Sequence, residues 1–251
     1  MKFAIIGGSG LAKLAGLQNT RRQVVRTPYG DPSGPLTFGQ LDGVDLVFLA
    51  RHGYGHTIAP HDINYRANVW ALQKAGVDGV VSVATVGGIG EEFGPGALVL
   101  PDQIIDYTFG RRNTYFEGAD QPVTHIDFTE PYDEGVRALL ARAADALGES
   151  MGMRATYGCC QGPRLETAAE IRRMERDGCD LVGMTGMPEA ALARELELPY
   201  AALAVVANHA AGKGDSRRAV SMEAITATVD EAMTRVRAIL AECVRLAATL
   251  D

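Results

Sequence analysis

The sequence predicts an α/β fold with a single domain, residues 1–251, built on a mixed, largely parallel sheet that is flanked by helices. Short apolar runs alternate with segments of helical periodicity along the whole chain. Apolar residues make up 47% of the composition, which is enough for a sheet that is covered on both faces. No repeat, low-complexity segment or linker divides the sequence.

The expected strands are the apolar runs. The first of them resembles the start of a signal peptide, but Gly7 and Gly8 interrupt it too early for that, so we interpret it as a buried strand. The full set is Phe3–Ile6, Val44–Ala50, Gly79–Ala84, Ala97–Ile105, Tyr157–Gln161, Leu181–Met184 and Tyr200–Ala207.

The expected helices keep apolar residues at helical spacing. Thr167 and Glu170 have the spacing of a capping box, and Ser221 is a suitable N-cap. Two polar stretches, Phe109–Asp120 and Ala211–Arg218, are expected to be long loops that serve as lids or interface arms. The helices are Asn64–Ala75, Asp133–Leu147, Thr167–Asp177, Pro188–Glu197 and a long last one from Ser221 to about Leu250.

Composition excludes several classes of function. The net charge of −7 argues against a general nucleic-acid binder, and no apolar run approaches the ~20 residues that span a bilayer. Four cysteines without a Cys-x-x-Cys pair make a disulfide framework or a zinc site unexpected. We expect reduced thiols in a cytoplasmic protein at Cys159, Cys160, Cys179 and Cys243.

Three expected strands end in motifs that suit an anion. Gly7-Gly-Ser-Gly-Leu11 offers backbone N–H groups and the Ser9 hydroxyl, although a tight turn explains it equally well. Ala50-Arg-His-Gly53 offers the fork of Arg51 and a second donor in His52, and its alternative is a surface ion pair. Ala84-Thr-Val-Gly-Gly88 adds small residues and a hydroxyl.

A metal site is not expected. His52, His56 and His61 have no carboxylate pattern nearby, and the glycines and Pro60 between them rule out a continuous helix.

Two further motifs join a strand or turn to a helix. In Gly162-Pro-Arg-Leu-Glu-Thr167 the helix start accounts for Thr167 but not for Glu166. In Gly183-Met-Thr-Gly-Met-Pro-Glu189 the proline suits the first helical turn, and Glu189 is interpreted as a favourable charge at the N-terminus of the helix.

Together with Asn64-Tyr-Arg-Ala-Asn-Val-Trp-Ala-Leu72, these motifs resemble the trimeric purine nucleoside phosphorylase and methylthioadenosine phosphorylase family, in order over most of the chain. The resemblance implies a homotrimer with sites at subunit interfaces, a nucleoside substrate, inorganic phosphate as co-substrate and no cofactor. Thr124-His-Ile-Asp-Phe128 resembles the arm that reaches a neighbour's site, so His125 is expected to act in trans.

The resemblance also assigns the site residues. Met184 is expected against the ribose, Leu165 on the purine, and Glu166 and Asn208 facing the purine, with Asn208 as the catalytic residue. Phosphate is expected to contact Ser9, Arg51, His52, Thr85 and Thr185.

Departures from the family pattern concern specificity. Methylthioadenosine phosphorylases typically carry Asp-x-Asp where this chain has Asn208-His-Ala210, and they lack a glutamate at the position of Glu166. The 6-oxopurine phosphorylases place a histidine near the ribose 5′-hydroxyl, where our alignment puts Met222. Ala84 replaces a hydroxyl or amide residue.

Hydrogen-bond chemistry gives these departures a meaning. Hypoxanthine presents N1–H as a donor, which an ionised Glu166 can accept, and O6 or N7, to which Asn208 can donate. Adenine reverses this pattern, because its N1 is an acceptor and its 6-amino group is a donor. Met222 offers an apolar surface to a 5′-methylthio group. The expected reaction is phosphorolysis of S-methyl-5′-thioinosine. Alternatives are a methylthioadenosine or inosine/guanosine phosphorylase, a hydrolytic nucleosidase and a non-catalytic nucleoside-binding protein.

Overall fold

The computed structural model describes residues 1–11, 14, 16–119 and 122–249. Its ten strands form one mixed sheet in the order β2-β3-β4-β1-β5-β9-β8-β7, and β10 pairs with both β5 and β6. The strands are β1 (Phe3–Gly7), β2 (Gln18–Gln23), β3 (Leu36–Leu41), β4 (Val44–Ala50), β5 (Gly79–Gly88), β6 (Leu98–Val99), β7 (Gln103–Asp106), β8 (Thr156–Cys159), β9 (Leu181–Gly183) and β10 (Tyr200–His209).

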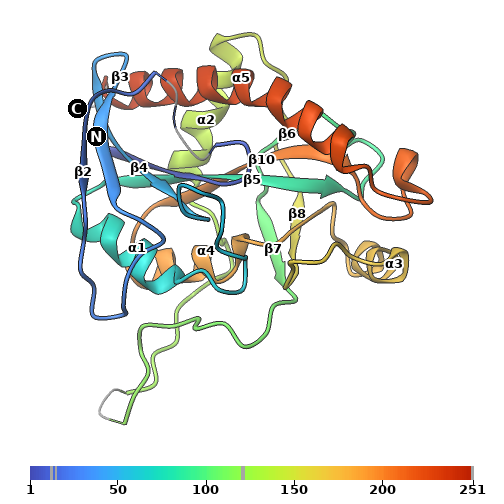
Figure 1. Ribbon diagram of the computed structural model, residues 1–251, viewed down its shortest axis with the longest axis horizontal. Helices are drawn as coiled ribbons and strands as arrows, with labels where there is room; N and C mark the ends of the chain where they lie inside the picture. The colour runs from blue at the N-terminus through green and yellow to red at the C-terminus, as the bar shows by residue number, and fades with distance from the viewer. Residues whose placement is uncertain (12–13, 15, 120–121, 250–251) are drawn as a thin grey trace.

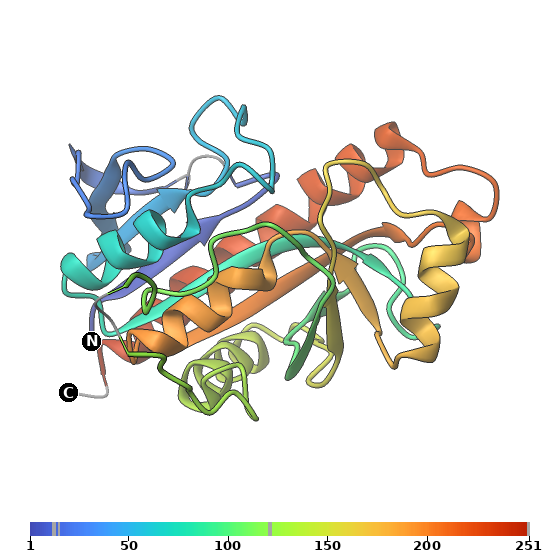
Figure 2. The same ribbon diagram turned by 90° about the horizontal axis from the view of Figure 1, so that it is seen from below.

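Helices cover both faces of the sheet (Figures 1 and 2). One face packs against α1 and α4, and the other packs against α2 and the long α5. The third helix, α3, lies at the end of the sheet beside β8 (Figure 1). The helices are α1 (Tyr65–Lys74), α2 (Glu134–Ala146), α3 (Ala168–Arg176), α4 (Gly186–Glu195) and α5 (Met222–Ala247), with a 3₁₀ turn η1 at Gly214–Ser216.

The central strands are buried on both sides because their apolar residues alternate between two cores. In β10, for example, Ala202 and Ala204 join the core under α1 and α4, whereas Leu203 and Val205 join the core under α2 and α5. Strand β1 pairs in parallel with β4 and with β5, and β5 pairs in parallel with β10. Their carboxyl ends therefore meet at one edge, which is where open α/β sheets bind ligands. The predicted fold class is confirmed.

Two parts of the sheet were not predicted correctly. The expected strand Ala97–Ile105 is two strands, β6 and β7, because the chain changes partner from β10 to β8 around Pro101, which has no N–H to donate. Strands β2 and β3 were missed. β2 has no apolar alternation and is exposed throughout, so only its pairing with β3 makes it a strand.

All five expected helices are present, with small shifts at their ends. The capping box of Thr167 and Glu170 is formed, and the Ser221 side chain accepts a hydrogen bond from the backbone of Ala224. The last helix is described as far as Ala247, and its expected end near Leu250 lies outside the described residues.

The expected loops are also present. The described residues between β7 and α2, 107–119 and 122–132, form a long arm whose middle extends away from the body of the molecule (Figure 1), whereas Tyr115 and Tyr132 are buried. Asp120, the expected end of the first loop, lies outside the described residues. None of the described helices is both long and apolar enough to cross a membrane.

Candidate active site

The carboxyl ends of β1, β4, β5, β9 and β10 surround a cavity of about 650 Å³, together with the first turns of α5. The cavity collects side chains that are far apart in the sequence. The predicted site residues that line it are Ser9, Arg51, His52, Thr85, Leu165, Glu166, Met184, Thr185, Asn208 and Met222.

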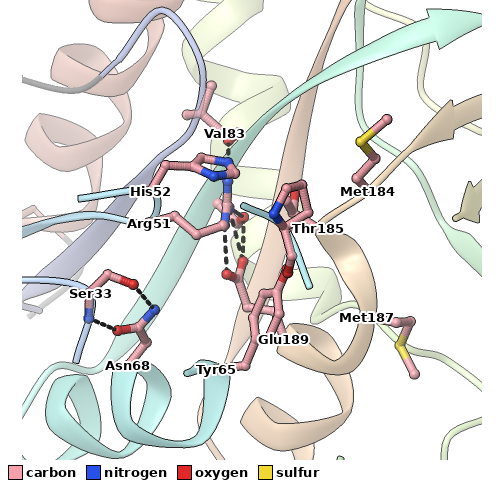
Figure 3. Close-up of polar contacts among 12 residues, drawn as sticks. Ser33, Arg51, His52, Tyr65, Asn68, Val83, Met184, Thr185, Met187 and Glu189 are labelled. Carbon is pink, nitrogen blue, oxygen red and sulfur yellow. Dashed lines mark hydrogen bonds and ion pairs between the residues drawn. The ribbon is translucent and has the colours of Figure 1, made fainter. Parts of the chain in front are cut away.

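Arg51 anchors the deep end of this cavity. Its side chain is 1% exposed, and its Nε and Nη2 donate to the two carboxylate oxygens of Glu189 at 2.7 and 3.0 Å (Figure 3). The Ser82 and Tyr200 hydroxyls also donate to Glu189, at 2.7 and 2.8 Å. Burial, the largest single influence, would lower the pKa of Arg51, but the charge and hydrogen bond of Glu189 together with Tyr200 and Tyr65 raise it above its ordinary value. Arg51 is therefore held as a cation inside the core.

This network revises the role that we expected for Arg51. The two-pronged side of its guanidinium faces Glu189 and not the open cavity (Figure 3). Nη1 donates to the carbonyl of Val83 at 3.2 Å, which leaves one N–H of that nitrogen for an anion. Arg51 can therefore supply positive charge and a single hydrogen bond, but in this arrangement it cannot supply a bidentate clamp.

His52 lies next to Arg51 in a fixed tautomer. Its Nδ1 donates to the carbonyl of Ile58 at 2.8 Å, so the proton of the neutral ring is on Nδ1 and Nε2 has a free lone pair. Burial, followed by the charge of Arg51, lowers the pKa of His52 to about 4. His56 also lines the cavity and packs on the His52 ring at 4.6 Å between centroids. Sequence reasoning had considered His56 only as a metal ligand.

Hydroxyl groups complete the deep end. The Thr85 hydroxyl donates to the carbonyl of Ser9 at 3.2 Å and so ties the turn after β1 to β5. Thr185 lies two residues after the end of β9 and is 8% exposed. Among the described residues, no group of three or more His, Cys, Asp or Glu side chains is placed to hold a metal ion. That the site needs no metal or cofactor stays a prediction.

A β-bulge positions Asn208. The pairing of β10 with β5 shifts between Val206 and Asn208, so Ala207 is the extra residue. The Asn208 amide nitrogen donates to the carbonyl of His209 at 2.6 Å, which orients the side chain and leaves its second N–H and its oxygen available. The bulge therefore directs an amide into the cavity.

The shallow end of the cavity has an apolar side. It is formed by the start of α5, where Met222 is 65% exposed and Ile225 and Val229 follow one and two turns later. Leu165, 41% exposed, and the half-buried Glu166 lie in the loop that precedes α3. His125 is exposed on the arm and is not among the residues that line the cavity of its own chain.

Comparisons with known proteins identify the family of this chain. The model of the phosphorylase superfamily matches residues 2–245. The chain belongs to this superfamily. Two curated relatives are a probable S-methyl-5′-thioinosine phosphorylase from Xanthomonas campestris, 52% identical over 97% of each chain, and a 6-oxopurine nucleoside phosphorylase from Pyrococcus furiosus, 48% identical over 84% of this chain and 80% of that protein. The family predicted from the motifs is confirmed.

Solved structures of phosphorylases share the fold. Methylthioadenosine phosphorylase from Schistosoma mansoni, in complex with adenine, is 32% identical and superimposes with a TM-score of 0.94. The alignment covers 100% of this chain and 93% of that one.

Sequence reasoning missed two residues that organise this phosphorylase site. Glu189 is 0% exposed and pairs with Arg51, so it does far more than complement the N-terminus of a helix. Arg111 reaches from the arm to the cavity walls, where its Nη1 donates to the carbonyls of Met184 and Met187 at 2.9 and 2.6 Å and its Nη2 to that of Gln161 at 2.9 Å. The sequence offered one signal for each of these residues: Glu189 is a charged residue in an apolar segment, and Arg111 is a charged residue in a loop.

Proposed function

We propose that this enzyme cleaves 6-oxopurine nucleosides with inorganic phosphate and that S-methyl-5′-thioinosine is its preferred substrate. One observation carries the proposal. A single cavity joins a cationic, hydroxyl-rich deep end to a carboxylate, an amide and an apolar shallow end. The names of the relatives, S-methyl-5′-thioinosine phosphorylase and 6-oxopurine nucleoside phosphorylase, agree with this chemistry.

The deep end is the proposed phosphate site. Ser9 and Thr185 would donate hydrogen bonds, Thr85 would do so once its hydroxyl turns from the Ser9 carbonyl to the phosphate, and Arg51 would supply charge and one N–H. Phosphate would attack C1′ of the ribose while the bond to N9 of the purine breaks, giving hypoxanthine and S-methyl-5-thioribose 1-phosphate. The protein orients the two reactants and stabilises an oxocarbenium-like transition state, so no protein nucleophile or cofactor is needed.

The purine would lie between Leu165, Glu166 and Asn208. An ionised Glu166 accepts from N1–H of hypoxanthine but would face the bare N1 of adenine as a second acceptor. Asn208 has one N–H left after its bond to His209, and this N–H can stabilise the negative charge that develops on the leaving purine. The ribose would lie against Met184, with the methylthio group against Met222.

A decisive assay compares three nucleosides with and without phosphate. Release of hypoxanthine from S-methyl-5′-thioinosine should require phosphate and should exceed cleavage of inosine and of S-methyl-5′-thioadenosine. Equal hydrolysis without phosphate would identify a nucleosidase, and binding without turnover would identify a non-catalytic binding protein. Preference for the adenine nucleoside would refute the assignment of the purine site.

We also propose a cytoplasmic homotrimer in which the arm completes a neighbour's site. The four cysteines are free thiols, which suits a reducing compartment. Phe109 and Val123 are exposed apolar residues on the arm, at 72% and 81%, and His125 lies beside Val123. Sedimentation should give a trimer, and mixing His125→Ala chains with Asn208→Ala chains should restore part of the activity. A fully active monomer would refute this arrangement.

A further inference from the structure

Behind Glu166 lies a thiol that sequence reasoning had treated only as a reduced cysteine. The Sγ atom of Cys160 lies 2.6 Å from Oε1 of Glu166. Cys160 follows the end of β8, is 8% exposed, and is tied to the end of β9 by a bond from its backbone N–H to the carbonyl of Gly183 at 2.8 Å. Among the described residues, those that line the cavity include Glu166 but not Cys160.

The chemistry of the pair sets the direction of this hydrogen bond. An ionised carboxylate can only accept, so the thiol must donate. Burial, followed by the neighbouring charge of Glu166, raises the pKa of Cys160 well above its ordinary value, which keeps the proton on sulfur. The thiol is therefore a permanent donor at neutral pH.

In the part of the chain that the structure describes, no side chain other than Cys160 donates a hydrogen bond to Glu166. Arg164, two residues before Glu166, directs both terminal nitrogens to Glu170 at 2.9 and 2.8 Å. Glu170 in turn completes the capping box of α3 with Thr167. Within the described residues, the thiol of Cys160 is the one side-chain donor to the carboxylate of Glu166.

We propose that Cys160 is a positioning residue that sets the choice of purine through Glu166. The inference rests on the proposed function of Glu166 as the acceptor for N1–H. With Oε1 engaged by sulfur, Oε2 remains for the base. The thiol therefore holds the carboxylate so that Oε2 can accept from N1–H, which hypoxanthine carries and adenine lacks.

The test measures kcat/KM for S-methyl-5′-thioinosine and for S-methyl-5′-thioadenosine with saturating phosphate. Cys160→Ala and Cys160→Val remove the donor, and the valine also keeps most of the volume. Both should reduce the preference for the inosine nucleoside about 10-fold, the order expected for one hydrogen bond to a charged group. Cys160→Ser keeps a donor and should preserve the preference.

Cys179→Ala is the matched control, because Cys179 is buried in the same apolar cluster but bonds to Tyr107 and not to Glu166. It should leave the ratio unchanged. The KM for phosphate should stay constant in all four variants.

Two results would overturn the inference: a ratio in Cys160→Ala and Cys160→Val equal to that of the wild type, or a serine variant as impaired as the valine variant. If the alanine variant does not fold, the comparison of the ratio between Cys160→Val and Cys160→Ser tests the inference. The inference is judged by the change in ratio between variant and wild type. The proposed function is judged by the ratio of the wild type itself, so the two can fail separately.

Discussion

The deep and shallow ends of the cavity are built by different means. At the deep end, Arg51 and Glu189 are 1% and 0% exposed and share their hydrogen bonds with Ser82 and Tyr200. At the shallow end, Met222 is 65% exposed and lies on the first turn of a surface helix. A change at the deep end, the proposed phosphate site, is therefore expected to affect stability and phosphate binding together, whereas a change at the shallow end should alter substrate choice while the fold persists.

The largest effect is expected from Glu189→Ala, which leaves the buried Arg51 cation without its partner. Removing one member of a buried ion pair destabilises a protein by about 3–5 kcal/mol, measured here as the free energy of unfolding in urea. The KM for phosphate should rise as well, and the isosteric Glu189→Gln should show a smaller form of both defects. Glu175→Ala, which breaks the partly exposed pair with Lys213, is the control and should have little effect. If Glu189→Ala and Glu175→Ala lost the same free energy of unfolding, the buried pair of Arg51 and Glu189 would contribute no more to stability than a partly exposed ion pair.

A smaller effect, confined to selectivity, is expected from the double variant Glu166→Ser with Asn208→Asp. The aspartate removes the amide donor for O6 or N7, and the serine removes the acceptor for N1–H. At about 1–3 kcal/mol for each mispaired buried group, the ratio of kcat/KM should move at least ~10-fold towards S-methyl-5′-thioadenosine. Asn208→Asp alone should weaken cleavage of the inosine nucleoside without creating good adenosine activity. If the double variant also lost as much stability as Glu189→Ala, the contrast between the two ends would not hold.

Met222→His is expected to act only on the 5′ group. An imidazole can hydrogen-bond the 5′-hydroxyl of inosine, which methionine cannot, so inosine should gain about 2- to 10-fold relative to S-methyl-5′-thioinosine in kcat/KM. Met153→His makes the same change at another exposed methionine, which does not line the cavity, and should leave the ratio as in the wild type. A wild-type preference for inosine would refute this role of Met222 but not the purine assignment.

The smallest effect on stability at neutral pH is expected from His52→Gln. The pKa of His52 is lowered from 6.5 to about 4 in the folded protein by burial and by Arg51, so between these values the unfolded chain binds more protons. The free energy of unfolding should therefore fall as the pH drops from 6.5 to 4, and His52→Gln should flatten that decline. An unchanged profile in His52→Gln would contradict the lowered pKa.

Much of the fold was predictable because strands and helices in this chain follow local rules. The apolar runs that became β1, β4 and β10 are recognisable in isolation, and the caps at Thr167 and Ser221 use standard side-chain chemistry. Strand β2 was not predictable in this way, because its polar residues become a strand only through pairing with β3.

The same division holds for the site. The glycine-rich turn, the Arg51-His52 pair and the Glu166 and Asn208 positions were identified from residue type and from family motifs, and the structure gathers them in one cavity. Their partners were not identified. Nothing near Arg51 in the sequence indicates that its fork is occupied by a carboxylate 138 residues away.

The sequence by itself determined several of the chemical groups that reach the edge of the sheet, because Ser9, Arg51 and Thr185 come shortly after strand ends that the local apolar pattern sets. Only the tertiary structure decided how those groups are used: that Glu189 holds Arg51, that the bulge at Ala207 aims Asn208, and that Cys160 donates to Glu166. Hydrogen bonds and charge pairs act over about 3 Å in space, and residues that meet at that distance can be far apart along the chain.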